Sequence, residues 1–257
     1  SGLTYSMNKN KIESLADNVI NPITGELFSI PSLDMGGYAD LRFILREGGS
    51  MGDLYSRTDL RRDANGAIYM DESNNVYTQK IDNPDSYIKL GSVLPKGNLA
   101  WRNNFMWKNF HVGFMISARL GGVVFSRTQA VLDKFGVSEA SADARDNGFV
   151  LINGNDRINP ENWYTTVGST AVPQYYTYSA TNVRLQEASI GYTIPRKWLA
   201  NICDIKVSLI GRNLWMIYSK APFDPEAVAS TDNFYQGIDN FMMPSLRNVG
   251  FSLNFKF

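Results

Sequence analysis

Aromatic side chains interleaved with Asp and Asn are the residues of this 257-residue sequence best suited to hold a ligand. Aromatic rings stack on sugar faces, and mixed polar walls accommodate peptides, so these residues fit binding better than catalysis. The residues that we single out as a ligand surface are Trp163, Tyr164, Tyr175, Tyr176, Phe223 and Asp224. The plainer alternative is that the long loops carrying them pack on each other and on a partner.

Residues for catalytic or metal chemistry are scarce. The spacing of Asp224-Pro225-Glu226 matches no calcium loop, and a structural turn fits it better. A single histidine, His111, cannot build a His-based metal site, and a single cysteine, Cys203, cannot form an internal disulfide. We therefore predict that the protein is not an enzyme, with no catalytic residue, no metal site and no cofactor.

Charge and composition narrow the class of protein further. The 25 basic and 25 acidic side chains cancel, which removes the electrostatic argument for a nucleic-acid partner. At 44% hydrophobic and 19% charged residues the chain is too apolar for disorder, and its 12% aromatic content favours strands. The sequence contains no run of 18 apolar residues, so it predicts no transmembrane helix. A membrane β-barrel is not excluded by this.

Alternation of bulky and polar residues predicts about eight antiparallel strands. The clearest is 249–257, where Val249, Phe251, Leu253, Phe255 and Phe257 share one face. The other alternating runs lie at 3–7, 39–46, 51–58, 99–108, 110–120, 182–192 and 205–209. The run at 182–192 changes phase between Leu185 and Ala188, which predicts a β-bulge, and the segment from Trp107 to Phe110 predicts a hairpin turn.

The predicted connections alternate between short and long. Short ones lie near 48–50, 108–109 and 193–204, and the last has apolar residues at the spacing of a helical turn. Long, polar ones lie at 10–37, 60–97, 121–181 and 218–245. Transmembrane barrels have short turns on one side and long loops on the other, so this alternation favours a barrel. The chain starts in a strand-like pattern without an initiator Met, and we interpret it as a mature or a truncated chain, the latter being a piece of something longer.

The stretch from Asn182 to Pro195 and the one from Ile205 to Trp215 resemble the C-terminus of SusC/RagA-type TonB-linked outer-membrane transporters. The matching residues are Arg184, Leu185, Gly191, Tyr192, Pro195, Asn213, Leu214, Asp224, Pro225, Glu226 and Phe257. Weaker matches are the segments 91–95 and 107–110. The resemblance covers residues 91–257, while residues 1–90 fit by pattern alone.

The resemblance implies a 22-stranded barrel occluded by an N-terminal plug. Eight strands cannot close a barrel of that size, because the diameter grows with strand number. The expected fold is therefore all-β: residues 1–257 form the C-terminal part of a single transmembrane antiparallel barrel domain, with the plug and the earlier strands outside this chain.

The resemblance also implies a function and partners. It points to a TonB-dependent importer of oligosaccharides or peptides in the bacterial outer membrane, with lipid around the wall. A SusD-type lipoprotein would cover the barrel, TonB would act through the missing N-terminal part, and transporter–lid pairs would dimerise. The resemblance further implies that Phe251, Leu253, Phe255 and Phe257 form a signal for barrel assembly.

The sequence is also compatible with two other folds and functions. A soluble extracellular β-sandwich that binds a ligand would bury Phe251, Phe255 and Phe257 in a protein core. A complete small barrel with a porin or enzymatic function would need no further chain.

Overall fold

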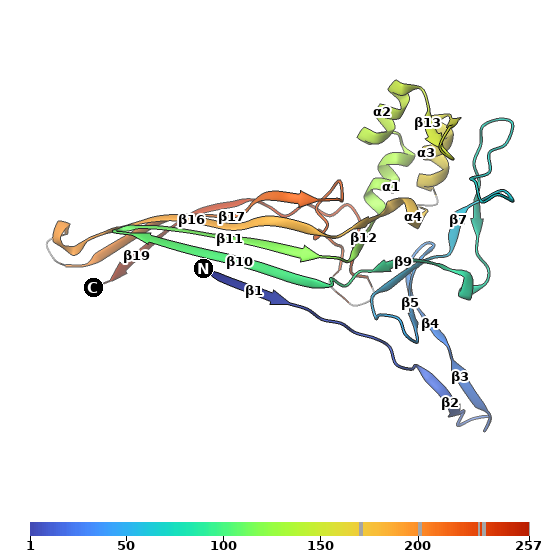
Figure 1. Ribbon diagram of the computed structural model, residues 1–257, viewed down its shortest axis with the longest axis horizontal. Coiled ribbons are helices and arrows are strands. Elements are labelled where there is room, and N and C mark those ends of the chain that lie inside the picture. Colours follow the sequence, from blue (N-terminus) through green and yellow to red (C-terminus); the bar gives the residue numbers. More distant parts are fainter. Residues whose placement is uncertain (170–171, 200–201, 231, 233–234, 257) are drawn as a thin grey trace.

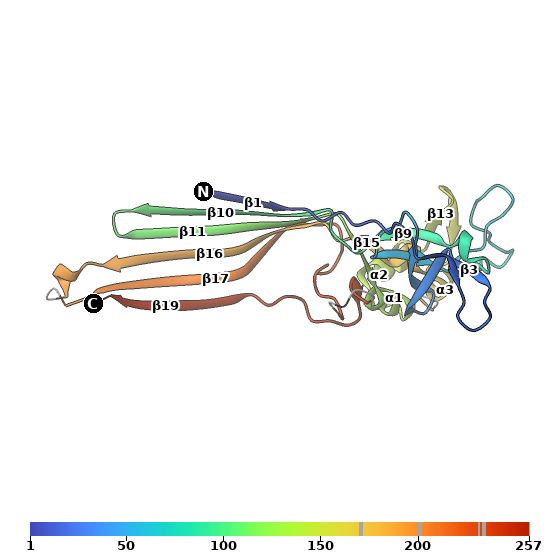
Figure 2. The same cartoon turned by 90° about the horizontal axis from the view of Figure 1, so that it is seen from below.

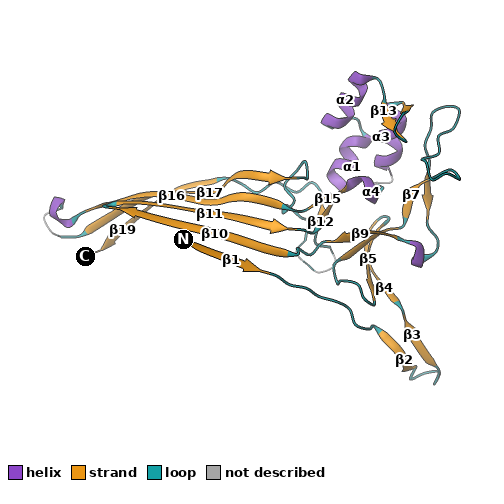
Figure 3. Cartoon of the chain, in the orientation of Figure 1, coloured by secondary structure: helices purple, strands orange, loops and turns teal. Residues whose placement is uncertain are grey.

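The computed structural model describes residues 1–169, 172–199, 202–230, 232 and 235–256. A sheet of long strands forms one end of the molecule, and helices with short sheets gather at the other end (Figure 1). The long strands run to the region where the helices begin, and the loops between them extend beyond the sheet (Figure 3). None of the helices in the described ranges is long and apolar enough to cross a membrane.

Within the described residues, the long sheet contains six antiparallel strands. In spatial order they are β1 (Gly2–Ser6), β10 (Gly97–Trp107), β11 (Phe110–Leu120), β16 (Asn182–Ile194), β17 (Asp204–Ser219) and β19 (Asn248–Lys256). Figure 2 shows them side by side in a single layer. The order from β1 to β19 is that of an open sheet, as expected for part of a larger barrel wall.

One face of this sheet is a continuous apolar surface. Because strand side chains alternate, residues in register share a face: Val112 lies opposite Ile190, Ile190 opposite Leu209, and Leu209 opposite Phe251. Their exposed fractions are 42, 53, 54 and 77%. The neighbouring row on the opposite face is His111, Gly191, Ser208 and Ser252. An exposed apolar face backed by a polar one is the pattern of a transmembrane barrel wall.

The turn and the bulge predicted from the sequence are both present. Trp107 pairs with Phe110, and Lys108 between them has a φ of 53°, which a two-residue hairpin turn requires. The register of β16 shifts against β17 between Leu185 and Glu187. On the β17 side, Asn213 takes a left-handed φ of 51°, a conformation that Asn tolerates better than most residues.

The helical end carries the remaining elements. Its helices are α1 (Arg127–Lys134), α2 (Glu139–Asn147), α3 (Pro160–Ser169) and α4 (Pro173–Tyr176). One sheet contains β4 (Ser32–Tyr38), β5 (Leu41–Arg46), β6 (Asp53–Ser56) and β9 (Ile88–Ser92), and another contains β15 (Thr177–Ser179), β12 (Val123–Ser126) and β18 (Ile238–Asp239). Three hairpins pair β2 (Ala16–Ile20) with β3 (Leu27–Ile30), β7 (Thr58–Leu60) with β8 (Thr78–Lys80), and β13 (Val150–Ile152) with β14 (Asp156–Ile158). Two short 3₁₀ helices are η1 (Pro84–Ser86) and η2 (Arg196–Trp198).

Two of the eight predicted wall strands do not belong to the wall. The runs at 39–46 and 51–58 form β5 and β6 in the four-stranded sheet, so six of the predicted strands remain in the long sheet. Leu41, Phe43 and Leu54 have no exposed surface and pack with Phe125 in a protein core. An alternating pattern indicates only that one face of the strand is shielded from water. It does not distinguish shielding by lipid from shielding by a protein core.

The long connection at 121–181 is also more ordered than expected from its polar composition. Its described residues, 121–169 and 172–181, fold into the four α-helices and the strands β12 to β15. Its aromatic and aliphatic side chains complete the core that begins in β5 and β6, including Ile158, Val167 and Tyr176. The loop side of the sheet therefore carries a packed protein unit with its own hydrophobic core.

The sandwich alternative does not fit this arrangement. It requires the apolar face of the last strand to lie inside a protein core, yet Phe251 and Phe255 are 77 and 56% exposed. Phe257 lies outside the described residues. The fold is instead that of a partial antiparallel barrel wall.

Candidate functional site

Four of the predicted ligand residues meet in one pocket of about 600 Å³ at the helical end. Trp163 and Tyr164 come from α3, and Tyr175 and Tyr176 come from α4. Tyr178 of β15 joins them. We call this cavity the aromatic pocket; its other lining residues are Gln129, Leu132, Asp133, Val137, Ser138, Glu139, Ala140, Asp143, Val167 and Pro222.

Helix caps and one glycine position the walls of the aromatic pocket. The hydroxyl of Ser126 accepts the backbone N–H of Gln129 at the start of α1, and that of Ser138 accepts the N–H of Ser141 at the start of α2. A Cβ on Gly168 would lie 2.6 Å from the carbonyl oxygen of Ala130. The glycine therefore allows α3 to approach α1 closely enough to bring their side chains into one cavity.

The rings of the aromatic pocket contact one another and neighbouring backbone. Trp163 and Tyr175 pack edge to face with ring centroids 5.4 Å apart. The hydroxyl of Tyr164 donates to the carbonyl oxygen of Ala140 at 3.1 Å, which ties α3 to α2. Tyr176 is 2% exposed, whereas Tyr164 and Tyr175 are only half-buried and keep part of their surface accessible.

The lining carboxylates give the aromatic pocket a negative potential: Asp133 is buried, whereas Glu139 and Asp143 are exposed at its rim. Burial raises the pKa of Tyr164, and the charges of Asp133 and Asp143 raise it further. Burial and the Asp133 charge likewise raise the pKa of Tyr178 to about 12. These phenols therefore stay protonated at neutral pH, and each ring experiences the field of at least one carboxylate.

The other two predicted ligand residues lie elsewhere. Phe223 packs edge to face against Tyr178 with centroids 5.5 Å apart, and it lines a second pocket of about 330 Å³ together with Asp224. Asp224 itself is bound to Arg184, whose side chain is only 3% exposed. The structure thus gathers Trp163, Tyr164, Tyr175 and Tyr176 and leaves Phe223 and Asp224 outside that group.

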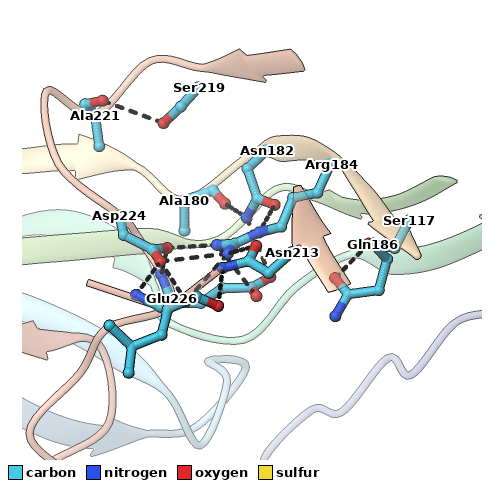
Figure 4. Close-up of polar contacts among 12 residues, drawn as sticks. Ser117, Ala180, Asn182, Arg184, Gln186, Asn213, Ser219, Ala221, Asp224 and Glu226 are labelled. Atoms are coloured by element: carbon cyan, nitrogen blue, oxygen red, sulfur yellow. Dashed lines mark hydrogen bonds and ion pairs between the residues drawn. The ribbon is translucent and has the colours of Figure 1, made fainter. Parts of the chain in front are cut away.

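Arg184 of β16 is the centre of a buried polar network (Figure 4). Both of its terminal nitrogens donate to the carboxylate of Asp224. Nη2 also lies 3.2 Å from a carboxylate oxygen of Glu226, and Nε donates to Oδ1 of Asn182 at 3.1 Å. The Asp-Pro-Glu segment is therefore the structural turn that the sequence favoured, and it fixes the loop after β17 onto β16.

The far end of that loop joins the same network. Asp224 accepts both the backbone N–H and the hydroxyl of Ser245. Asn213, the residue with the left-handed φ, lies 3.4 Å from Nη1 of Arg184 and donates to the carbonyl oxygen of Leu246 at 3.3 Å. The loop from 220 to 247 is consequently held to the wall near both of its ends.

Acid should weaken the network through Asp224. Burial alone would raise the pKa of this carboxyl, but hydrogen bonds from Arg184 and Ser245 outweigh it and lower the pKa from 3.8 to about 2. A depressed native pKa gives stability that is complete above the unfolded value and is lost as the pH falls through about 2. The shift corresponds to about 2 kcal/mol. We expect the stability difference between the full-length protein and its Asp224→Asn variant, measured by unfolding in detergent, to shrink by about that amount between pH 5 and pH 2; a difference independent of pH would contradict this.

The predicted assembly residues lie on the last strand of the wall. Phe251, Leu253 and Phe255 occupy the apolar face of β19, opposite Leu209, Val207 and Ile205 of β17. Their position fits a signal read on an exposed strand, and the role stays a prediction. In the ranges that the structure covers, no group of three His, Cys, Asp or Glu side chains is arranged to hold a metal ion.

Sequence reasoning missed the acidic and amide residues of the aromatic pocket. Gln129 and Asp133 lie on α1, and Glu139 and Asp143 on α2, within a segment expected to be irregular. The signal available was the pair of serine caps at 126 and 138, each followed by helix-compatible residues. With the two helices placed, the 3–4-residue spacing of these polar side chains would have put them on shared helix faces.

Comparison with known proteins bears on the family. The chain is 25% identical over 286 residues to TonB-dependent receptor P3 of Formosa agariphila, a match that covers the whole chain and 26% of the receptor. The RagAB peptide transporter matches 90% of the chain with a TM-score of 0.55 and 14% identity. The RagAB peptide importer in its open-open state matches 99% with a TM-score of 0.62 and 12% identity. The resemblance to SusC/RagA-type TonB-dependent transporters is confirmed.

The coverage of these matches sets their scope. The chain spans about a quarter of the length of the curated receptor and of the RagAB chains. No protein-family profile matches it. The structural matches establish that the sheet and its loops share the fold of part of a RagA-type barrel.

Proposed function

We propose that this chain is the C-terminal barrel-wall and loop portion of a TonB-dependent importer in the outer membrane of a Gram-negative bacterium. The complete protein would be a plugged 22-stranded barrel that takes up oligosaccharides or peptides. A SusD-type lipoprotein would close it from outside, and TonB would supply energy through the part of the protein that precedes this chain. Pairs of transporter and lipoprotein would form dimers.

The single-layer sheet carries this proposal. Its apolar row from Val112 to Phe251 is exposed on each of the four strands that it crosses, and the row behind it is polar or small. An exposed apolar surface of this extent is unfavourable on a soluble protein. In a barrel wall the apolar face contacts lipid and the polar face contacts the hydrated lumen, so both faces are satisfied. The proposed roles of TonB and of the lipoprotein rest on the family resemblance. The similar RagAB structure is described as a peptide transporter, which favours peptides over oligosaccharides as the substrate.

On this proposal, each group of candidate residues has a separate role. Phe251, Leu253, Phe255 and Phe257 would present the last strand to the assembly machinery. Tyr164 and Tyr175 would contact substrate at the loop side of the barrel, and the buried Trp163 and Tyr176 would form the wall behind them. Phe223 and Asp224 would hold the loop that frames the entrance, since Asp224 is bound to Arg184.

Localisation and energised uptake together test the proposal. We expect the complete native protein to fractionate with the outer membrane, to exceed this chain several-fold in mass and to change gel mobility on heating, as folded barrels do. Cells carrying it should accumulate labelled oligopeptide or oligosaccharide, and a protonophore should abolish that uptake. A soluble protein of this chain's own size would contradict the proposal, as would uptake unaffected by the protonophore.

A further inference from the structure

We propose that the aromatic pocket binds an organic cation, the alkylammonium or guanidinium group of a ligand that reaches the loop side of the sheet. This inference deepens the proposed function and rests on it for the direction from which the ligand arrives. It assigns a ligand chemistry to the pocket that the overall fold does not specify.

The shape of the pocket suits a small group or a side chain. Its volume of about 600 Å³ falls within the roughly 300 to 1,000 Å³ usual for small-molecule sites. Five aromatic rings from α3, α4 and β15 line it: Trp163, Tyr164, Tyr175, Tyr176 and Tyr178. Aromatic faces attract cations through the ring quadrupole, and a cluster of such rings is a known arrangement for holding ammonium groups.

The charge of the pocket is of one sign. Its charged lining residues, in the part of the chain that is described, are the carboxylates Asp133, Glu139 and Asp143, with no Lys, Arg or His among them. Asp133 is 6% exposed and accepts hydrogen bonds from the Gln129 amide at 2.8 Å and from the Tyr176 hydroxyl, both of which are neutral groups. A buried carboxylate without a cationic partner is costly, so a cation in the cavity would be stabilised by it.

The nearby cations are engaged elsewhere. Arg145 of α2 donates to the carbonyl oxygen of Gly136 at 2.6 Å, and Lys134 of α1 lies over the ring of Phe135 at 5.6 Å. Arg62, whose charge reaches Tyr175, is paired with Asp59 at 3.0 Å. Lys134 and Arg145 line a neighbouring pocket that shares Asp133 and Tyr164 with the aromatic pocket. Among the described residues, however, no ion pair joins a cation to Asp133, Glu139 or Asp143. These carboxylates would therefore favour a cationic ligand and repel an anionic one.

Matched neutral and cationic probes test the inference. The probes are an acetylated and amidated Ala-Lys-Ala peptide, its norleucine analogue, a glucosamine disaccharide and the N-acetylated disaccharide, titrated by calorimetry into the full-length protein in detergent. We expect at least one cationic probe to bind ten-fold or more tightly than its neutral partner. Binding by the peptide pair alone, or by the sugar pair alone, identifies which molecule carries the cation. Equal affinity within both pairs, or no binding by either, would overturn the inference.

Variants locate the binding in the pocket. Asp143→Asn and Tyr164→Leu should each weaken the cationic probe by three-fold or more. Asp146→Asn changes the same charge on the same helix, outside the pocket lining, and should leave affinity unchanged. If Asp146→Asn weakens binding as much as Asp143→Asn does, the effect comes from general charge and the assignment fails.

The same protein separates this inference from the proposed function. Uptake that fails in cells while the purified protein still binds the cationic probe would overturn the importer and leave the pocket assignment standing. Energised uptake by a protein that shows no preference for the cationic probe would overturn the pocket assignment alone.

Discussion

Replacing Arg184 with Met should destabilise the wall and its loop by about 3 to 5 kcal/mol. The substitution leaves Asp224, whose side chain is 9% exposed, facing Glu226 without the guanidinium that neutralises both. It also removes the donors to Asn182 and Asn213. We expect a lower unfolding midpoint for the full-length protein in detergent and faster proteolysis of the 220–247 loop.

Arg212→Met is the matched control. Arg212 lies on β17 and pairs with Glu187 at 3.2 Å, but its side chain is 67% exposed, so its loss should cost less than about 1 kcal/mol. Adding Asp224→Leu to Arg184→Met should recover part of the stability, because an apolar pair of similar volume can replace a buried ion pair. Equal effects of the two Arg variants would mean that burial does not set the strength of the network.

Placing an arginine at Phe251 should strongly reduce the amount of assembled protein in the outer membrane. Phe251 is 77% exposed on the apolar face, and on the proposed fold that face meets lipid. Arginine on the lipid side of a barrel costs about 2 to 4 kcal/mol near the bilayer midplane. The measurement is the amount of heat-modifiable protein in the outer-membrane fraction and its unfolding midpoint in urea.

The neighbouring residue on the same strand gives the control. Ser252 follows Phe251 and points to the polar face, opposite Ser208, so Ser252→Arg should be tolerated far better. Leu209→Arg, directly opposite Phe251 on β17, should reproduce the loss. If Phe251→Arg alone has an effect, position 251 acts in recognition of the last strand and the lipid-facing assignment is wrong.

The strands of the wall could be predicted from the sequence because they are regular and have one apolar and one polar face. Alternation located six strands of the long sheet, the turn between Trp107 and Phe110, and the bulge near Leu185. These features follow from local rules, since a strand has a period of two and a bulge must break its phase. The positions of these strands, of the turn and of the bulge can therefore be predicted from the order of the residues alone.

The helical end could not be predicted in the same way. The runs around Phe43 and Leu54 alternate like wall strands but pack into a protein core with Phe125 and Tyr176, which are distant in sequence. Its helices, as far as the structure describes them, are ten residues long at most, and their hydrophobic stripes are weak. Tertiary packing, not periodicity, makes them stable.

The candidate site was predicted in its aromatic half. Trp163, Tyr164, Tyr175 and Tyr176 come from two consecutive helices and meet in the aromatic pocket. Asp133 was missed because a carboxylate on a polar segment cannot be distinguished from a solvated surface residue until the fold buries it. Asp143 stays exposed at the rim of the pocket, so its sequence context gave no signal either. Arg184 was visible as part of a motif, but its role depends on a loop 40 residues away.

The loop held by Arg184 has a mechanical consequence for the aromatic pocket. Between its two anchors the loop contributes Asp239, which accepts a hydrogen bond from Ser126 at 2.6 Å. Ser126 caps α1 through Gln129, and Gln129 in turn donates to Asp133 inside the pocket. An unbroken series of hydrogen bonds and backbone thus connects the barrel wall to a pocket carboxylate. A ligand that shifts Asp133 would therefore disturb a series of contacts that ends at the barrel wall, which is the physical connection that coupling between the two places requires.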